Sequence, residues 1–380
     1  MCLEATTDSE GYWFPLPEGW IERPLGELFE TQLGKMKGKN ASLGEQFSYL
    51  KGRNLQWGEV QVDSLETMHF SSSERMQYEL LAGDLLVCEY GEVGRCAIWE
   101  DNVPNCYFQN HIYRIRATGD LPVEYLRYFF EYATKMPRFS RFVTQTSVQQ
   151  ISQNNLRSIP IPYNPNSISN VISSLQELDL YLGLIEQMMS KLYYIRTGLI
   201  DEFFSNQIMQ GNQQIPFLDV AKLKRGYDLP TQERVKGDVP IFGSNGVVGF
   251  HNIAKIQPLG VITGRSGTIG KIHVSSCDFW PLNTSLYVVD FRGNDPNYVA
   301  ILLEWMRIEQ YAISTGVPSL DRKNVHSVMV PNVPAEQKTV IVDSIREIDR
   351  LIEIEIENKE KVNMTRSGIL SSFMCGDLYD

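Results

Sequence analysis

The sequence predicts an α+β protein made of two copies of one unit, each a mixed α/β globule followed by a long helix. Two observations predict this architecture. Segments of the first half return in the second half at a nearly constant offset, and each half ends in a stretch with the apolar spacing of a paired helix. We therefore expect the two helices to pair as an antiparallel coiled coil, with pseudo-twofold symmetry from the internal duplication.

Four segments recur in the same order about 170 residues later. The pairs are TSVQQISQNNLRSIPIP (146–162) with TGVPSLDRKNVHSVMVP (315–331), LQELDLYL (175–182) with IREIDRLI (345–352), RTGLIDEFFS (196–205) with RSGILSSFMC (366–375), and EYGEVGRCAIW (89–99) with RSGTIGKIHVS (265–275). Four ordered matches are hard to obtain by chance, so they indicate a single duplicated unit, not a solenoid.

The end of each unit has apolar residues separated by three or four positions. In the first copy these are Leu175, Leu178, Leu182, Ile185, Met189 and Leu192, and in the second they are Ile345, Ile348, Ile352 and Ile356. A mean spacing of 3.5 residues predicts a seam between two helices, although an ordinary core-facing helix is the alternative for either stretch alone. Each helix should span roughly 35 residues, or about 50 Å.

These patterns divide the chain into five parts: an N-terminal arm (1–22), a first globule (23–165), a central helix (166–210), a second globule (211–335) and a C-terminal helix (336–380). In both globules short β-rich runs, such as DLLVCEY and SLYVVD, alternate with turns rich in Gly, Asn and Pro. Short helical stretches such as PVEYLRYFFEYA interrupt them, so each globule is expected to mix strands and helices.

Charge and cysteine usage limit the classes of function. The net charge of −11 argues against a uniformly basic nucleic-acid binder, yet residues 211–335 carry 12 basic and 10 acidic side chains and form a net-positive block. The six cysteines contain no CxxC pair and the five histidines stand far apart, which favours reduced thiols and no metal site. With neither a signal peptide nor a membrane span evident, we expect a cytoplasmic protein.

Motif searches do not predict a catalyst. The glycine-rich stretch TGRSGTIGKIH (263–273) resembles a phosphate loop, but its glycine spacing is wrong and Ile272, not Ser or Thr, follows Lys271. The chain has no Pro-Pro dipeptide, which a DNA amino-methyltransferase motif requires, and no Gly-x-Ser-x-Gly elbow. We therefore predict no catalytic residue in this chain.

Several motifs together resemble the specificity (S) subunit of type I restriction-modification enzymes, over nearly the whole chain. LPEGWIERPLGEL, YLKGRNLQWG and GDLLVCEYGEVGRCAIW resemble a first target-recognition domain of that family, whereas VPIFGSNGVVGFHN, GVITGRSGTIGKIH and FWPLNTSLYVV resemble a second, different subtype. The SIPIPYNP and SVMVPNVPAEQ segments resemble the junctions that lead from domain to helix.

The resemblance implies a non-catalytic subunit that recognises a bipartite, asymmetric site on double-stranded DNA and takes part in phage defence. It also implies two methyltransferase subunits, and restriction subunits, as partners that carry S-adenosylmethionine, ATP and magnesium, with no cofactor on this chain. Two alternatives stay open: a recognition subunit of a methylation-only or other phage-defence methyltransferase system, and a coiled-coil adaptor unrelated to DNA.

Candidate DNA-binding residues are polar or cationic side chains at predicted turns and strand ends, where they could meet phosphates or base edges. The first domain contributes Lys35, Lys37, Lys39, Tyr90, Glu92, Arg95, Thr146, Ser147, Gln149 and Gln150, and the second contributes Ser244, Asn245, Arg265, Ser266, Thr268, Lys271, Thr315, Ser319, Arg322 and Lys323. For each, an ordinary solvated turn or surface charge is the alternative.

Overall fold

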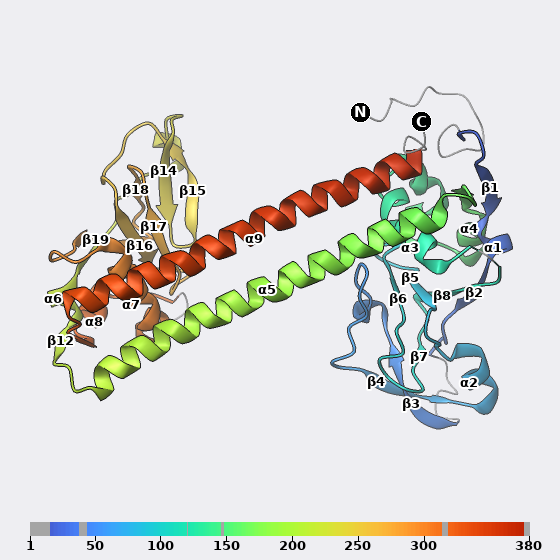
Figure 1. The fold of residues 1–380 in the computed structure, drawn as a ribbon, viewed down its shortest axis with the longest axis horizontal. Helices are drawn as coiled ribbons and strands as arrows, with labels where there is room; N and C mark the ends of the chain where they lie inside the picture. The colour runs from blue at the N-terminus through green and yellow to red at the C-terminus, as the bar shows by residue number, and fades with distance from the viewer. Residues whose placement is uncertain (1–15, 38–43, 120, 146–147, 314–317, 376–380) are drawn as a thin grey trace. The chain divides into compact units, whose positions relative to one another are not determined.

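The computed structural model describes residues 16–37, 44–119, 121–145, 148–313 and 318–375. The chain forms two compact units, each with its own core. The first unit lies within residues 1–183 and 359–380, and the second spans 184–358. The two long helices, α5 (Ile168–Met209) and α9 (Ala335–Cys375), therefore each contribute to both units; they are the green and red helices of Figure 1.

The first unit is a mixed α/β globule. Its strands are β1 (Ile21–Pro24), β2 (Phe29–Leu33), β3 (Glu45–Leu50), β4 (Glu66–Phe70), β5 (Leu85–Cys88), β6 (Cys96–Ile98), β7 (Tyr107–Phe108), β8 (Ile112–Ala117), β9 (Thr144–Gln145), β10 (Gln149–Gln150) and β11 (Pro160–Tyr163). Its short helices are α1 (Leu25–Leu28), α2 (Ser72–Tyr78), α3 (Val123–Ala133) and α4 (Gln153–Ser158), with 3₁₀ turns at η1 (Gly52–Asn54) and η2 (Pro137–Phe142).

The second unit repeats this plan. Its strands are β12 (Gln214–Pro216), β13 (Lys222–Arg225), β14 (Val239–Gly243), β15 (Gly246–His251), β16 (Gly260–Gly264), β17 (Ile272–Ser275), β18 (Trp280–Pro281), β19 (Ser285–Asp290) and β20 (Met329–Pro331). Its short helices are α6 (Phe217–Val220), α7 (Pro296–Trp305) and α8 (Arg322–His326), with 3₁₀ turns at η3 (Thr231–Glu233) and η4 (Ile308–Tyr311).

The four-stranded and three-stranded sheets have the same topology in the two units. The four-stranded sheets have the orders β2-β8-β5-β6 and β13-β19-β16-β17, and the three-stranded sheets have the orders β4-β3-β7 and β15-β14-β18. In each three-stranded sheet one pair, β3–β7 or β14–β18, is parallel. The equivalence confirms the predicted duplication and the mixed α/β character of both globules.

The helices α5 and α9 run antiparallel, as predicted, and each unit shows this within itself. In the first unit the start of α5, with Leu175, shares a core with Phe373 near the end of α9. In the second unit the later part of α5, with Phe204, shares a core with Ile341 near the start of α9. Each core is thus completed by the helix that belongs to the other sequence copy.

Most of the predicted seam positions face inward. Leu175, Ile185, Ile345 and Ile352 are buried, whereas Leu178, Leu182, Met189, Leu192 and Ile348 are half-buried. Ile356 is a correction, because its side chain is 39% exposed. Two consecutive steps of four residues, from Ile348 through Ile352 to Ile356, turn the position by about 80° around the helix, away from the seam. The next residue of α9 after Ile352 whose side chain is half-buried is Glu355, not Ile356.

In the first unit Arg366 of α9 joins three helices. Its Nη1 and Nη2 atoms donate to the two carboxylate oxygens of Glu131 on α3 at 2.6 and 2.7 Å, and its Nε donates to Asp179 Oδ1 on α5 at 2.5 Å. Arg127 Nη2 and the Tyr128 hydroxyl donate to the other oxygen of Asp179 at 3.0 and 2.8 Å. Burial raises the pKa of Asp179, but these donors outweigh it and bring the pKa below its ordinary value.

The second unit contains the same arrangement with the two long helices exchanged. Arg196, now on α5, donates from Nη1 to Glu304 on α7 at 2.7 Å and from Nε to Asp349 on α9 at 2.6 Å. Because Arg196 and Arg366 are duplicates, as are Asp179 and Asp349, the network is part of the repeated unit. We call each of these an Arg–Asp–Glu clamp.

We expect Arg366→Met to lower the free energy of unfolding by about 2–3 kcal/mol, because Glu131 would lose its charged donor and Asp179 one of its two, in a partly buried site. Urea denaturation of the full chain measures this, with hydrogen exchange in α3 identifying the first unit as the part affected. Arg346→Met is the matched control: Arg346 forms an exposed pair with Asp343 three residues away, worth under about 0.5 kcal/mol. Equal effects of the two variants would contradict the clamp.

Candidate nucleic-acid interface

Two glycine turns occupy the same place in the two units, β5–β6 in the first and β16–β17 in the second. Gly91 and Gly94 have φ values of +82° and +88°, and Gly267 and Gly270 have φ values of +83° and +98°. Side chains other than glycine rarely adopt this left-handed region, so the glycine spacing matches the requirements of the turn. We call them the first and second reading turns, residues 89–95 and 265–271.

In the first unit the reading turn is fastened to two other segments by backbone hydrogen bonds. Glu89 N donates to His111 O at 2.9 Å, Ile151 N donates to Glu89 O at 3.0 Å, and Gly91 N donates to Gln149 O at 2.9 Å. These bonds bring together Tyr90, Gln149 and Gln150, which were predicted as candidates from widely separated parts of the sequence.

The second reading turn makes the equivalent three bonds. Arg265 N donates to Thr284 O at 2.8 Å, Leu320 N donates to Arg265 O at 2.7 Å, and Gly267 N donates to Pro318 O at 3.3 Å. Ser266 and Ser319 form a bridge that corresponds to the bridge between Tyr90 and Gln150. Glu89 and Arg265 therefore occupy the same structural position with opposite charge.

In the first turn the carboxylate of Glu89 is a buried acceptor. It accepts from the backbone N–H of His111 at 3.1 Å, from His111 Nδ1 at 3.1 Å and from Gln150 Nε2 at 3.3 Å. A carboxylate can only accept, so Nδ1 carries the proton there. The backbone of His111 has φ = +78°, which is uncommon for a residue with a side chain, and its ring lies 5.2 Å from that of Tyr90.

Glu92 and Arg95 of the first turn bond to each other and to the globule. Glu92 accepts from Trp57 Nε1 at 2.6 Å and from Arg95 Nη1 at 2.9 Å. Arg95 also donates to the carbonyl of Gly52 at 3.1 Å. The cation of Arg95 is thus engaged inside the unit, and the outer face of this turn offers mainly Tyr90, His111 and the glutamine side chains.

The second turn presents a different set of groups. Arg265 is half-buried and donates through Nε to the carbonyl of Asn283 at 2.9 Å, which orients its guanidinium. Thr268 and Lys271 are exposed. A Cβ atom built on Gly267 would lie 3.6 Å from Ser244 Oγ, so the β14–β15 hairpin tip that carries Ser244 and Asn245 lies beside this turn.

The remaining candidates lie elsewhere. Lys35 is buried, and its Nζ donates to Glu74 and to the carbonyl of His69, both at 2.7 Å, so its cation is not presented to a phosphate. Lys37 is exposed, as are Arg322 and Lys323 on α8. Four candidates lie outside the described residues: Lys39, Thr146, Ser147 and Thr315.

Sequence reasoning missed Glu89 and His111. A signal for Glu89 was present, because the duplicated turns align it with Arg265, the position at which their charges differ most. His111 follows Asn110, which aligns with Asn283 at the start of a duplicated strand. Its contact with Glu89 joins residues 22 positions apart and required the fold.

The described residues contain no helix long and apolar enough to cross a membrane. Nor, in that part of the chain, do three or more His, Cys, Asp or Glu side chains gather in a group that could hold a metal ion.

The shared topology, with a glycine turn and an Arg–Asp–Glu clamp in each unit, defines an internally duplicated protein of two α/β units. The family model for the type I restriction modification DNA specificity domain matches residues 17–186 and 209–364. The chain therefore belongs to the type I restriction-modification DNA specificity family.

Individual relatives are distant but match nearly the whole chain. A Methanocaldococcus jannaschii protein named "Putative type I restriction enzyme MjaX specificity subunit" is 19% identical over 96% of this chain and 94% of its own length. The crystal structure of a type I restriction-modification system S subunit from M. genitalium is 15% identical, with a TM-score of 0.63 over 94% of this chain and 96% of that one.

A second solved structure, described as the structural basis underlying complex assembly and conformational transition of the type I R-M system, contains a chain that is 14% identical. Its TM-score is also 0.63, over 96% of this chain and 100% of that chain. At these identities the likeness shows the shared fold.

We expect Gly264→Ala to disrupt the second reading turn, because a Cβ atom there would lie 1.8 Å from the carbonyl oxygen of Thr268. The backbone must move, so the free energy of unfolding should fall by more than about 2 kcal/mol. Gly198→Ala is the matched control. Nothing lies within 4 Å of its added Cβ in α5, so it should stabilise the helix by about 0.5–1 kcal/mol. Thermal unfolding of both variants measures the difference, and a neutral Gly264→Ala would contradict the described turn.

Proposed function

We propose that this chain is the sequence-recognition subunit of a type I restriction-modification complex and reads a bipartite, asymmetric site on double-stranded DNA. The observation that carries the proposal is the equivalence of Glu89 and Arg265. One scaffold occurs twice, with a carboxylate at its centre in one copy and a guanidinium in the other. Two readers of different chemistry related by pseudo-twofold symmetry would select two different half-sites, whereas identical readers would favour a palindrome.

The groups at each turn support distinct base contacts. Arg265 can donate two hydrogen bonds to the O6 and N7 atoms of guanine, and Ser266 and Thr268 add hydroxyls beside it. In the first unit Gln149 and Gln150 carry amides of the kind that pairs with adenine. Glu89 is buried, so its role is to hold His111 and Gln150 in position, while those two side chains meet the DNA.

The partners in this proposal are two methyltransferase subunits, with restriction subunits joining the complex. The chemistry would reside in those partners, which would bind S-adenosylmethionine, ATP and magnesium, while this chain supplies recognition without catalysis. The proposal places the complex in the cytoplasm, where it would act on incoming phage DNA. Family membership is what supports these assignments.

Methylome sequencing tests the proposal. A host that expresses this chain with the methyltransferase encoded beside it should gain methylation at one split sequence motif. The same host expressing the methyltransferase alone should not. A chain that neither co-purifies with the methyltransferase nor directs methylation would overturn the proposed function, and methylation without cleavage in the presence of all neighbouring subunits would indicate a methylation-only system.

We expect Arg265→Ala to relax recognition at the second half-site only. Losing a bidentate guanine contact should lower affinity for the preferred duplex by about 1–3 kcal/mol, or roughly 5- to 150-fold, and leave preferences in the first half-site unchanged. Binding competition among duplexes with single base-pair changes measures this. Arg350→Ala, which removes an exposed cation on α9 that pairs with Glu347, should have no effect. Equal loss on every sequence would mean that Arg265 contacts phosphate alone.

We also propose that the paired helices set the spacing of the half-sites. The helix α5 has 42 residues and α9 has 41, so each is about 60 Å long. Inserting one heptad after Leu192 in α5 and another after Ile352 in α9 would keep the seam in register and add about 10 Å. The methylated motif should then gain about three base pairs between its halves.

The control for this insertion places seven residues in the loop at 210–213, outside both helices, and should leave the motif unchanged. An unaltered spacing in the doubly extended variant would contradict the role of the helices as a spacer.

A further inference from the structure

An exposed basic strand lies at one edge of the four-stranded sheet of the second unit. Within the described residues β13 pairs with β19 alone, and its side chains Lys222, Lys224 and Arg225 are exposed while Leu223 is buried at 1% exposure. His326 Nε2 accepts the backbone N–H of Leu223 at 2.8 Å, which ties this edge to α8. We call the four exposed cations Lys222, Lys224, Arg225 and Lys255 the basic edge.

Two cations of the basic edge, Lys224 and Lys255, have aromatic neighbours instead of carboxylates. Lys224 Nζ lies 5.6 Å from the ring centroid of Tyr227, and Lys255 Nζ lies 5.9 Å from the same ring and 4.8 Å from that of Trp280. Among the residues that the structure describes, no carboxylate lies within ion-pair distance of any of the four cations. Rings hold the ammonium groups without neutralising them, so the positive charge stays available to an anion.

The basic edge is connected to the second reading turn. Asn283 donates to Asp228, next to Tyr227, and its backbone carbonyl accepts from Arg265. The ring of Trp280 lies under Lys255, and Trp280 precedes Asn283 by three residues. At most about 10 Å of chain therefore separates Trp280 from Asn283. A turn placed in a major groove about 12 Å wide would therefore bring these cations to the phosphates that border the groove.

The first unit has no such edge at the equivalent place. Gly34 and Gly226 show which residues of β2 and β13 are equivalent, because both pack tightly against a carbonyl oxygen. A Cβ atom on Gly34 would lie 2.2 Å from that of Gln109, and a Cβ atom on Gly226 would lie 2.1 Å from that of Leu282. Counting back along the strands, Gln32 stands where Lys224 stands, and Leu33 where Arg225 stands.

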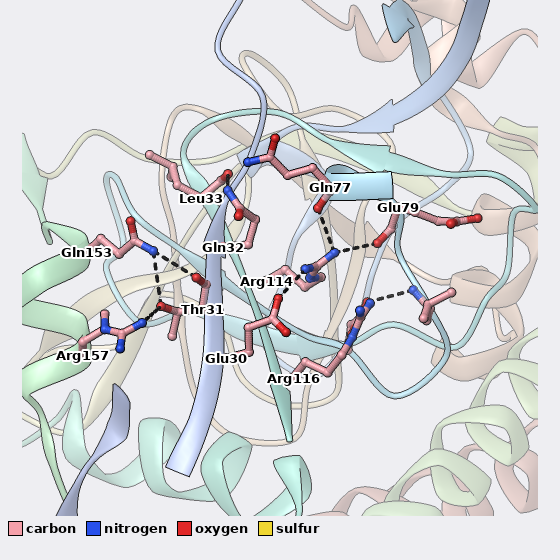
Figure 2. Close-up of polar contacts among 12 residues, drawn as sticks. Glu30, Thr31, Gln32, Leu33, Gln77, Glu79, Arg114, Arg116, Gln153 and Arg157 are labelled. Atoms are coloured by element: carbon pink, nitrogen blue, oxygen red, sulfur yellow. Dashed lines mark hydrogen bonds and ion pairs between the residues drawn. The ribbon is translucent and has the colours of Figure 1, made fainter. Parts of the chain in front are cut away.

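Figure 2 shows this strand of the first unit, in which the polar side chains bond within the globule. Glu30 accepts from Arg114 at 2.9 Å, and Gln32 donates to the carbonyl of Leu33 at 2.7 Å. Thr31 accepts from Gln153 at 3.3 Å and lies 3.5 Å from Arg157. No cation of β2 is presented to solvent, because the strand contains none.

We propose that the basic edge of the second unit grips the DNA phosphate backbone beside the half-site that Arg265 reads, and that the first unit binds without this contact. The inference rests on the proposed function and adds a division of labour to it: the second unit supplies more of the sequence-independent affinity. Lys224 and Lys255, held beside Tyr227, are the residues that carry it.

The test measures binding of the full chain, with its methyltransferase, to the methylated-motif duplex and to a scrambled duplex between 50 and 200 mM salt. Lys224→Ala and Lys255→Ala should each weaken binding to both duplexes and reduce the salt slope by about one. Raising the salt fourfold weakens binding of the parent chain by a certain factor. For each variant this factor should be about 3.5 times smaller. Lys191→Ala, which removes an exposed cation on α5 of the same unit, is the control and should keep the parent slope.

The outcomes separate this inference from the proposed function. Parent-like slopes for Lys224→Ala and Lys255→Ala, in a chain that binds its motif normally, would overturn the basic edge alone. A change in base preference would also overturn it, because phosphate contacts carry no sequence information. A parent chain that binds neither duplex would overturn both proposals.

Discussion

Each unit of this protein is held to the two long helices by an arginine that bonds two carboxylates at once. Arg366 joins Glu131 of α3 to Asp179 of α5, and Arg196 joins Glu304 of α7 to Asp349 of α9. A guanidinium has donors on several sides, so it can fix the orientation of a helix against two others where a lysine could not. Removing Arg366 would take the charged donor from Glu131 and leave Asp179 with Arg127 and Tyr128, so the clamp adds to the apolar cores that also fix each globule against the helices.

The same scaffold supports different chemistry in the two units because its fixed parts are backbone and its variable parts are side chains. Three backbone hydrogen bonds hold each reading turn regardless of which side chains it carries. Glu89 can therefore be exchanged for Arg265, and Gln32 for Lys224, without a change in topology. Separating position from chemistry in this way is what the proposed recognition of two unlike half-sites requires.

The duplication, the long helices and the turn glycines could be predicted because they depend on local spacing. Ile356 could not be placed correctly from spacing alone, since the choice between positions 355 and 356 depends on where the partner helix lies. Lys35 looked like part of a surface charge run, but its contact with Glu74 joins residues 39 positions apart. The contacts of Glu89 with His111 and Gln150 are equally non-local. The basic run at Lys222–Arg225 was visible, whereas its freedom from carboxylates required the packed structure.

The exchange of helices between the two sequence copies has a consequence for biosynthesis. The core of the first unit contains Leu370, Phe373 and Met374, together with residues as early as Trp20. At ribosomal rates of roughly 5–20 residues per second, the first globule emerges about 10–40 s before the segment that closes its core. Until then Glu131 and Asp179 lack Arg366, and the apolar face of α5 has no covering helix. During this interval the incomplete first unit is accessible to chaperones and proteases.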